Sequence, residues 1–449
     1  MGRITLGQAA QWCGGRIDAK YKDISFLGAN NDSRKIQPGQ LFLALQGARD
    51  GHDFIPMALQ KGAAAVLCTH CDGDYPAIIV DDVRIALGQI AAGERQRIGM
   101  TVVGITGSVG KSTTKEMIAC VLSAVYRVAK TPENHNNDIG MPMAVLSIPE
   151  DTEVAVLEMG MNHFREIAYL TNIARPDLSV IINIGTMHIE HLGSQEGILK
   201  AKLEIAEGMG ENGQLILNGD DAYLRKAPSM VTQKITYFGT GENCDVRGDS
   251  IVEGEGIAYQ ACCGDEHFGI RLPVEGLHHV PDSLAAVAVG LKLGVAPEAI
   301  TSALANFRNM DGRQEIFEAK GYTIIKDCYN AGPESMAAAL AVLGKRQGRK
   351  IAVLGDMLEL GISTQAEHYR IGRIAAEKAD VLLAYGPNGE RMVSGAVTGG
   401  MKNVQAFDDH GELAAYLKRI AKPGDTMLFK GSHGMHMEIA LELFLKDET

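Results

Sequence analysis

Residues 101–114 read Thr-Val-Val-Gly-Ile-Thr-Gly-Ser-Val-Gly-Lys-Ser-Thr-Thr, and this stretch decides the fold at the centre of the chain. The apolar run at 101–105 predicts a buried strand, and residues 111–125 predict a helix. A glycine loop between them points backbone N–H groups at one spot, where the helix N-terminus adds partial positive charge. The stretch therefore predicts a loop that holds nucleotide phosphates; the alternative is a chance glycine turn.

The side chains of this loop suit a nucleoside triphosphate. Gly107 and Gly110 let the backbone approach phosphate without a Cβ in the way. Lys111 is placed to reach the β- and γ-phosphates, and the Ser112 hydroxyl is placed to ligate Mg²⁺. Ile105 stands where the common phosphate loop has its first glycine, so the match is to a shorter pattern, (S/T)-G-x-x-G-K-(S/T)-(S/T). The ATP-binding residues expected here are Gly107, Ser108, Val109, Gly110, Lys111, Ser112 and Thr113.

Bulk composition limits the class of protein. A chain of 449 residues is too long for one ordinary core, so two or three domains are expected. The formal net charge of -12 argues against nucleic acid as the main partner, because nucleic-acid phosphates bind basic faces. Residues 1–8 do not read as a signal peptide, and no apolar run reaches the roughly 18–20 residues that span a bilayer. We expect a cytoplasmic protein without a membrane span.

The eight cysteines are scattered along the chain. Cys68 and Cys71 have the spacing of a metal-binding pair, but no second pair follows at zinc-site spacing. Reduced thiols therefore explain the pattern better than a structural zinc.

Apolar strands alternate with helical patterns along the chain, which predicts βαβ units and parallel sheets. We expect an α/β fold of three domains: a small one at 1–82, a central one at 83–311 that carries the phosphate loop, and a Rossmann-like one at 312–449. A helix at 84–97 leads into the central domain, and a Gly-rich stretch at 251–272 suggests an antiparallel edge. The other predicted strands lie at 41–45, 65–67, 77–80, 154–157, 178–182, 214–217, 323–325, 350–354, 381–384 and 426–429.

Two polar side chains follow buried strands of the central domain. Glu158 ends the strand at 154–157, and His188 follows the strand at 178–182. Groups at the carboxyl ends of strands face the ligand crevice of an open α/β sheet, so both belong on the side of the phosphate loop. With Ser112 they make a Mg²⁺ ligand set, although histidine is an unusual ligand for magnesium. Each alone is also explained as a salt-bridge carboxylate or a hydrogen-bonded surface histidine.

A polar, turn-rich segment at 131–140 is unsuited to a core. It holds Thr131 and the asparagines Asn134, Asn136 and Asn137. Composition alone leaves two readings, a solvated loop or a loop that recognises polar substrate groups.

In their joint order and spacing, these segments resemble the Mur ligase family of ATP-dependent enzymes that form amide bonds. The resemblance covers essentially the whole chain. Residues 31–54 are similar to the uridine-nucleotide-binding segment of the family. The other matching segments are 106–114, 134–137, 158–162 and 188–202 in the centre, and 312–315, 327–335 and 353–361 in the third domain.

Within the family, the third-domain motifs are similar to those of ligases that add D-alanyl-D-alanine to UDP-N-acetylmuramoyl-tripeptide. The resemblance implies that ATP phosphorylates the terminal carboxylate of the tripeptide and that the amine of the dipeptide attacks the acyl phosphate. In line with the net charge, we expect no nucleic-acid partner, and we expect a monomer. The catalytic residues that it implies are Lys111, Glu158, His188 and Lys202.

The resemblance also implies two Mg²⁺ ions, held by Ser112, Glu158, His188 and Lys202. Lys202 matches a lysine that is carbamylated in related ligases, a change that turns a cation into an anionic oxygen ligand. The alternatives are a surface lysine paired with Glu204, or a role for Lys200 in its place.

The remaining binding residues are carried over by the same resemblance. Those expected to bind the UDP-sugar peptide are Ser33, Arg34, Gly47, Asp50, Gly51, His52, Thr131, Asn134, Asn136 and Asn137. Those expected to join the phosphate loop in binding ATP are Asp282, Arg313, Asp327, Tyr329 and Asn330.

The chain departs from the family pattern at four positions. Asp282 replaces an asparagine that reads adenine, and an ionised aspartate cannot donate to a ring nitrogen. His433 replaces an arginine, which exchanges a permanent cation for a titratable one. Gly332 replaces an asparagine, and Arg165 stands where glycine is common.

Three rival functions follow from these departures and from the breadth of the family. The first is a sibling ligase that adds a single amino acid, and the second is a folylpolyglutamate-type ligase. The third is a phosphate-loop ATPase or binding module that has lost ligation. The sequence leaves open whether the accepted tripeptide ends in meso-diaminopimelate or lysine.

Overall fold

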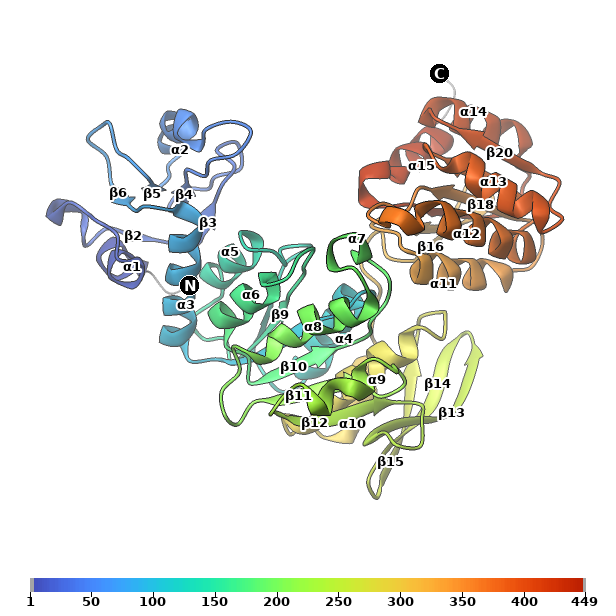
Figure 1. The fold of residues 1–449 in the computed structure, drawn as a ribbon, viewed down its shortest axis with the longest axis horizontal. Coiled ribbons are helices and arrows are strands. Elements are labelled where there is room, and N and C mark those ends of the chain that lie inside the picture. The colour runs from blue at the N-terminus through green and yellow to red at the C-terminus, as the bar shows by residue number, and fades with distance from the viewer. Residues whose placement is uncertain (1–3, 447–449) are drawn as a thin grey trace.

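The computed structural model describes residues 4–446. Residues 1–3, on which part of the signal-peptide expectation rests, lie outside the described residues, as do residues 447–449. The described strands form four sheets in three units, coloured blue, cyan to yellow, and orange to red along the chain in Figure 1. The α/β fold expected from the sequence is confirmed.

The first unit is built on a four-stranded parallel sheet in the order β3-β4-β5-β6. Its helix α1 (Leu6–Cys13) begins at Thr5, whose side chain accepts from Gln8 N, and ends at Gly14 in the left-handed region. A short pair, β1 (Ile4–Thr5) and β2 (Ser25–Phe26), flanks the sheet. The sheet strands and second helix are β3 (Ala29–Asn30), β4 (Leu41–Leu43), β5 (Ala65–Cys68), β6 (Ala77–Ile79) and α2 (Ile55–Gln60).

Helix α3 (Val83–Ile98) joins the first unit to the second. Asp82 caps its start by accepting from the backbone of Arg84 and Ile85, and Gly99 ends it with φ 71°. Its buried face packs against α1 on one side and against α5 and α6 on the other. One continuous apolar core therefore runs from the first unit through α3 to one face of the central sheet.

The central unit contains a nine-stranded sheet in the order β15-β14-β13-β12-β11-β10-β7-β9-β8. From β8 at one edge to β13, neighbouring strands pair parallel. Strands β13, β14 and β15 pair antiparallel, so the antiparallel edge expected at 251–272 is confirmed. The strands are β7 (Thr101–Thr106), β8 (Val128–Lys130), β9 (Val154–Glu158), β10 (Leu178–Ile181), β11 (Gln214–Asn218), β12 (Lys234–Gly239), β13 (Val246–Gly254), β14 (Gly256–Cys263) and β15 (Glu266–Leu272).

Helices cover both faces of this sheet. One face packs against α4 and α9, and the other packs against α3, α5 and α6. Because β7, β9 and β10 are buried on both faces, they read in the sequence as continuous apolar runs. The helices are α4 (Lys111–Leu122), α5 (Gly140–Leu146), α6 (Glu166–Ala174), α7 (Ile189–Leu192), α8 (Gln195–Leu203), α9 (His279–Lys292) and α10 (Pro297–Ala305).

The third unit is a six-stranded sheet in the order β16-β17-β21-β18-β19-β20, parallel except for the β16 edge. Helices α11 to α13 cover one face, and α14 and α15 cover the other. The elements are β16 (Glu315–Ala319), β17 (Tyr322–Asp327), α11 (Pro333–Gly344), β18 (Lys350–Gly355), α12 (Thr364–Lys378), β19 (Val381–Tyr385), α13 (Gly389–Thr398), β20 (Val404–Phe407), α14 (His410–Ile420), β21 (Thr426–Lys430) and α15 (Met437–Leu445).

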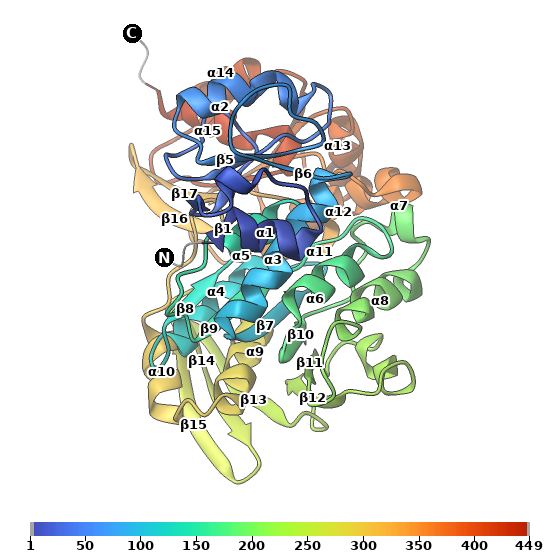
Figure 2. The same ribbon diagram turned by 90° about the vertical axis from the view of Figure 1, so that its left-hand side faces the viewer.

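The first and third units stand above the same side of the central unit, which Figure 2 shows from a second direction. The start of α4 and the loop after β10 contact the third unit there. Among residues 4–446, no helix is long and apolar enough to cross a membrane.

The close contact between α12 and α13 yields a test of how the third unit packs. A Cβ on Gly372 of α12 would lie 1.9 Å from the Met392 carbonyl oxygen of α13. We expect Gly372→Ala to lower the free energy of unfolding, because overpacking costs about 1–3 kcal/mol and outweighs the helix-propensity gain of up to about 1 kcal/mol. Urea denaturation measures the change. In the control, Gly210→Ala, the new Cβ meets nothing within 4 Å; equal stability of the two variants would contradict the packing described here.

Candidate active site

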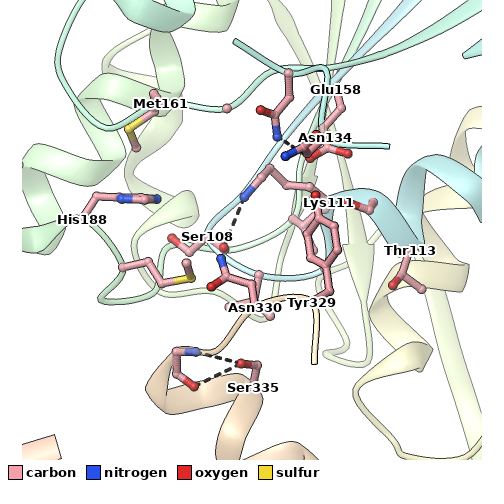
Figure 3. Close-up of a pocket in the computed structure, with 18 of the residues that line it drawn as sticks. Ser108, Lys111, Thr113, Asn134, Glu158, Met161, His188, Tyr329, Asn330 and Ser335 are labelled. Atoms are coloured by element: carbon pink, nitrogen blue, oxygen red, sulfur yellow. Dashed lines mark hydrogen bonds between the residues drawn. The ribbon is translucent and has the colours of Figure 1, made fainter. Parts of the chain in front are cut away.

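A cavity of about 880 Å³ lies where the central unit meets the third unit (Figure 3). Its walls bring together most of the residues that the sequence nominated. Those that line it are Ser108, Val109, Gly110, Lys111, Ser112, Thr113, Asn134, Asn136, Asn137, Glu158, His188, Asp282, Arg313, Asp327, Tyr329 and Asn330. Those that do not line it are Gly107, Thr131, Lys202, Ser33, Arg34, Gly47, Asp50, Gly51 and His52.

The phosphate loop is held in place by hydrogen bonds to the side chain of Asn183, which follows β10. Its Oδ1 accepts from the backbone N–H groups of Ser108 (3.0 Å) and Val109 (2.9 Å), and its Nδ2 donates to the Val109 carbonyl oxygen at 2.9 Å. Gly110 turns the chain into α4 with φ 89°, and a Cβ there would meet Asp282 Oδ1 at 2.7 Å. Helix α4 begins without a side-chain cap, so its first N–H groups remain available to an anion.

Sequence reasoning missed Asn183. Its signal was an amide side chain directly after a buried parallel strand, next to the strand that enters the loop. Such a side chain can satisfy several N–H and C=O groups of a neighbouring loop at once.

Lys111 folds back over its own loop. Its Nζ donates to the carbonyl oxygens of Gly107 (2.9 Å) and Ser108 (3.3 Å). Burial lowers the pKa of Lys111, the carboxylate of Glu158 opposes that shift, and Arg313 adds to it. An incoming phosphate would replace the two carbonyl oxygens as partner and restore a full counter-charge.

Ser112 is contacted from the third unit. Arg313 Nη2 donates to Ser112 Oγ at 3.1 Å, and its guanidinium carbon lies 3.7 Å from the centre of the Tyr329 ring. Burial raises the pKa of the Tyr329 hydroxyl, so it stays protonated at neutral pH. A cation supported on an aromatic face therefore stands beside the hydroxyl expected to ligate Mg²⁺.

Glu158 is buried, with one oxygen hydrogen-bonded and the other without a hydrogen bond. Its Oε1 accepts from Asn136 Nδ2 at 2.9 Å, whereas its Oε2 has no hydrogen-bond partner among the described residues. The nearest cation is Lys115, whose Nζ lies 3.7 Å from Oε2. A carboxylate that is only 2% exposed and keeps an unpartnered oxygen is a suitable ligand for a cation at the phosphate loop.

Lys115, one helical turn after Lys111, was also missed by sequence reasoning. It is fully buried, and its Nζ donates to the carbonyl oxygens of Thr131 (2.8 Å) and Glu133 (3.3 Å). Burial lowers its pKa, while Glu158 and Glu116 oppose that shift. Lys115 therefore ties α4 to the asparagine loop, which explains why this polar segment is ordered beside the cavity.

His188 lies at the N-terminus of α7 with φ 62°, and its ring projects into the cavity in Figure 3. Its Nδ1 lies 2.7 Å from Oε2 of Glu359, which belongs to the third unit; this is an ion-pair distance, and the two atoms are not aligned for a hydrogen bond. Contact with His188 lowers the pKa of the Glu359 carboxyl. Sequence reasoning did not single out Glu359, although it lies in a segment that resembles the family.

Lys202 is buried on α8 and only 2% exposed. Burial, followed by the charge of Lys111, holds the pKa of Lys202 well below its usual range. The alternative pairing with Glu204 is wrong, because both Glu204 oxygens accept from the Arg165 N–H at 2.9 Å and cap α6. Lys200, two residues earlier, is exposed.

The third-unit residues are arranged around another buried lysine. Lys430 Nζ donates to Asp327 Oδ2 at 2.7 Å and to the Asn330 carbonyl oxygen at 2.9 Å. His433, from the same strand end, lines the cavity with its ring centre 6.1 Å from that of Tyr329. The charge of Asp327 is thus already balanced before any ligand binds.

Three of the four departures from the family pattern have local accounts. Asp282 Oδ1 accepts from Thr114 Oγ1 at 2.9 Å, so an adenine amino group would have to share or displace that partner. Gly332 caps the start of α11 and faces Met187 of the central unit. Arg165 adopts φ 73° before α6, a conformation that glycine reaches more easily.

The residues nominated for uridine binding lie in the first unit. Asp50 Oδ1 accepts from His52 N at 3.0 Å and lies 2.6 Å from His52 Nδ1. Gly51 approaches the Leu45 carbonyl oxygen so closely that a Cβ would lie 2.5 Å from it. These contacts shape one loop of the first unit, apart from the residues that line the cavity.

The thiols of Cys68 and Cys71 point to separate carbonyl oxygens, those of Ile78 and Gly73. Burial raises the pKa of Cys68 to about 12, which keeps it protonated. Within residues 4–446, no group of three or more His, Cys, Asp or Glu side chains is placed to hold a metal. The ligand set expected at the phosphate loop differs in kind, since it includes a serine and a lysine.

Comparison with known proteins places the chain in a family. Three family models match it: the Mur ligase family catalytic domain over residues 23–95, the Mur ligase middle domain over 105–290, and the Mur ligase glutamate ligase domain over 312–433. The chain belongs to the Mur ligase family and is therefore a ligase.

Within the family, the chain is similar to ligases of one kind in both sequence and structure. A Bacillus subtilis (strain 168) protein named UDP-N-acetylmuramoyl-tripeptide--D-alanyl-D-alanine ligase is 40% identical over 429 residues, 93% of each chain. Crystalline MurF from Acinetobacter baumannii matches with a TM-score of 0.90 at 33% identity, over 99% of this chain and 100% of that one. MurF ligase from Thermotoga maritima, in complex with ADP, matches with a TM-score of 0.82 at 31% identity, over 93% and 96%.

The buried lysine provides a test of the site's architecture. We expect Lys115→Met to lower the free energy of unfolding by about 3 kcal/mol, because it leaves a buried carboxylate and two carbonyl oxygens without their cation. Denaturant unfolding followed by circular dichroism measures the loss. The matched control is Lys130→Met, which removes a half-exposed lysine paired with Glu116 and should cost less than about 1 kcal/mol. Equal losses would refute the role given to Lys115.

Proposed function

We propose that this chain uses ATP to join D-alanyl-D-alanine to the tripeptide end of UDP-N-acetylmuramoyl-tripeptide. Family membership gives the ligase class, and the names of its full-length relatives give the substrates. The observation that carries the chemistry is the cavity itself, which is lined jointly by the phosphate loop, by Glu158 and by residues of the third unit.

The three units would divide the substrate among them. The first unit would hold the uridine end through Ser33, Arg34, Gly47, Asp50, Gly51 and His52. The asparagine loop at 131–137 would hold the peptide arm, since Asn134, Asn136 and Asn137 line the cavity. The third unit would admit the dipeptide and close over the nucleotide, because an acyl phosphate must be shielded from water.

The residues present fit Mg²⁺ at the phosphate loop. Glu158 offers an unpartnered buried oxygen, and the Ser112 hydroxyl lies at the start of α4. Ser112 and Glu158 would hold one ion, and Glu158, His188 and Lys202 would hold a second. Bound Mg²⁺ neutralises phosphate charge and polarises the oxygens that it contacts.

Phosphoryl transfer brings two anions together, the tripeptide carboxylate and the γ-phosphate, so charge neutralisation governs the rate. Lys111 would leave the carbonyl oxygens of Gly107 and Ser108 and donate to the phosphate. Arg313 would bring a second cation from the third unit, held on the face of Tyr329. The dipeptide amine then attacks the acyl carbon, and the tetrahedral intermediate expels phosphate.

Lys202 is proposed to be carbamylated. Burial and the charge of Lys111 lower the pKa of Lys202 and so favour its neutral amine. A neutral amine adds to CO₂ with loss of one proton to give an anionic carbamate. That anion would satisfy the buried position beside Lys111 better than a second cation does. The protein is proposed to act in the cytoplasm as a monomer.

Phosphate release tests the proposed reaction. We expect release from ATP only when UDP-N-acetylmuramoyl-tripeptide and D-alanyl-D-alanine are both present, because the acyl phosphate forms on the first and is consumed by the second. Tripeptides ending in meso-diaminopimelate and in lysine are compared in parallel. Release supported by a single amino acid would indicate a sibling ligase, and release with ATP alone would indicate an ATPase that has lost ligation.

Carbon-13 NMR after incubation with ¹³C-bicarbonate tests the carbamate. We expect a carbamate carbon signal from the native enzyme and none from Lys202→Ala, which should also lose most of its turnover. Lys200→Ala is the control, because this exposed lysine lies two residues away and should keep both signal and turnover. Unchanged turnover of Lys202→Ala would exclude the carbamate from the mechanism.

A further inference from the structure

One carboxylate of the third unit reaches a proposed metal ligand of the central unit. Oε2 of Glu359, in the loop after β18, lies 2.7 Å from Nδ1 of His188. We propose that Glu359 is a positioning residue, which holds the imidazole of His188 so that its Nε2 would be free to bind a metal ion. The proposal rests on the function proposed above and adds to it a residue from another unit.

The backbone at both ends of this contact is unusual. His188 has φ 62° and Glu359 has φ 63°, in a region that residues with a Cβ rarely adopt. Two such residues face each other across one interface. Strained conformations of this kind persist where the surroundings fix them, and they cluster at functional sites.

On the central side, the loop before α7 is fixed to the third unit at several points. Thr186 Oγ1 donates to Glu334 Oε1 at 3.1 Å. Met187 packs against Gly332, where a Cβ would lie 3.0 Å from its side chain. The position of His188 is therefore set by the same interface that supplies Glu359.

On the third-unit side, the loop that carries Glu359 is held by hydrogen bonds to other parts of the same unit. The Leu358 N–H donates to Ser432 Oγ at 2.9 Å, and the Met357 N–H donates to His368 Nε2 at 3.0 Å. Gly361, with φ 51°, comes so close to Glu190 of α7 that a Cβ there would lie 2.8 Å from the Glu190 Cβ. Glu359 therefore projects from a held loop toward the central unit.

The chemistry of the contact favours a metal ligand. A carboxylate beside one ring nitrogen favours the proton on that side of the ring, which leaves the other nitrogen free to present its lone pair. Imidazole is otherwise a weak partner for Mg²⁺. Figure 3 shows the ring projecting into the cavity between the labelled side chains of Met161 and Ser108.

This arrangement links docking of the third unit to metal binding. If Glu359 strengthens His188 as a ligand, the ion bound through His188 must in turn favour the docked state, because coupling between two binding events is reciprocal. In the rival account, which we call the latch, the contact between Glu359 and His188 holds the two units together and competes with the metal for His188. The two accounts predict opposite signs when the charge of Glu359 is removed.

Mn²⁺ binding to the full chain in the presence of ADP, followed by electron paramagnetic resonance, separates them. We expect Glu359→Gln to weaken the second Mn²⁺ by about 10-fold and to leave the first unchanged, in line with the 10–100-fold effects of removing such partners. In a His188→Ala background the same substitution should change nothing further. Glu190→Gln, on the exposed face of α7, is the matched control and should bind both ions as the native chain does.

Unchanged or tighter binding of the second ion by Glu359→Gln would overturn the proposal, and tighter binding would establish the latch. A native chain that binds only one Mn²⁺ would overturn the two-ion site on which the proposal rests. No ligation assay is involved, so a chain that binds two ions yet fails to join the dipeptide would leave the role of Glu359 supported and the proposed reaction refuted.

Discussion

The arrangement of the site depends on one buried carboxylate that is only half satisfied. Glu158 ends β9 beside the phosphate loop, with Oε1 held by Asn136 and Oε2 without a hydrogen bond. Burying such a group is costly unless a cation faces it. Lys115 lies 3.7 Å from Oε2, and Glu158 also lines the cavity. The positions of α4 and the asparagine loop follow from that requirement, since Lys115 binds both to the same point.

The interface between the central and third units is polar where the chemistry is expected. Arg313 reaches Ser112, Glu334 reaches Thr186, and Glu359 reaches His188. Interfaces of this kind between domains are typical of units that move relative to each other. The cavity walls are therefore assembled by contacts that water can replace, whereas the core of each unit is apolar.

The fold was largely predictable because its strands are buried on both faces. Runs such as 101–105 and 350–354 have few polar interruptions, and their helices are marked by caps such as Asp82. Glu158 and His188 could be placed on the loop side because each follows a parallel strand. Lys115 and Asn183 could not be assigned partners, since their partners are backbone atoms of distant loops. Glu359 could not be assigned to His188, because their contact depends on how two separately folded units dock.

Helix α3 has a mechanical consequence. The apolar core of the first unit passes through it without interruption into one face of the central sheet. Rotating the first unit away would expose that core to water, at a cost that grows with the apolar area uncovered. The third unit has its own two cores and meets the centre through separate polar contacts. The first and central units should thus move as one rigid body, and the third unit should move relative to them. The hinge for that motion should lie almost entirely in the segment between α10 and β16.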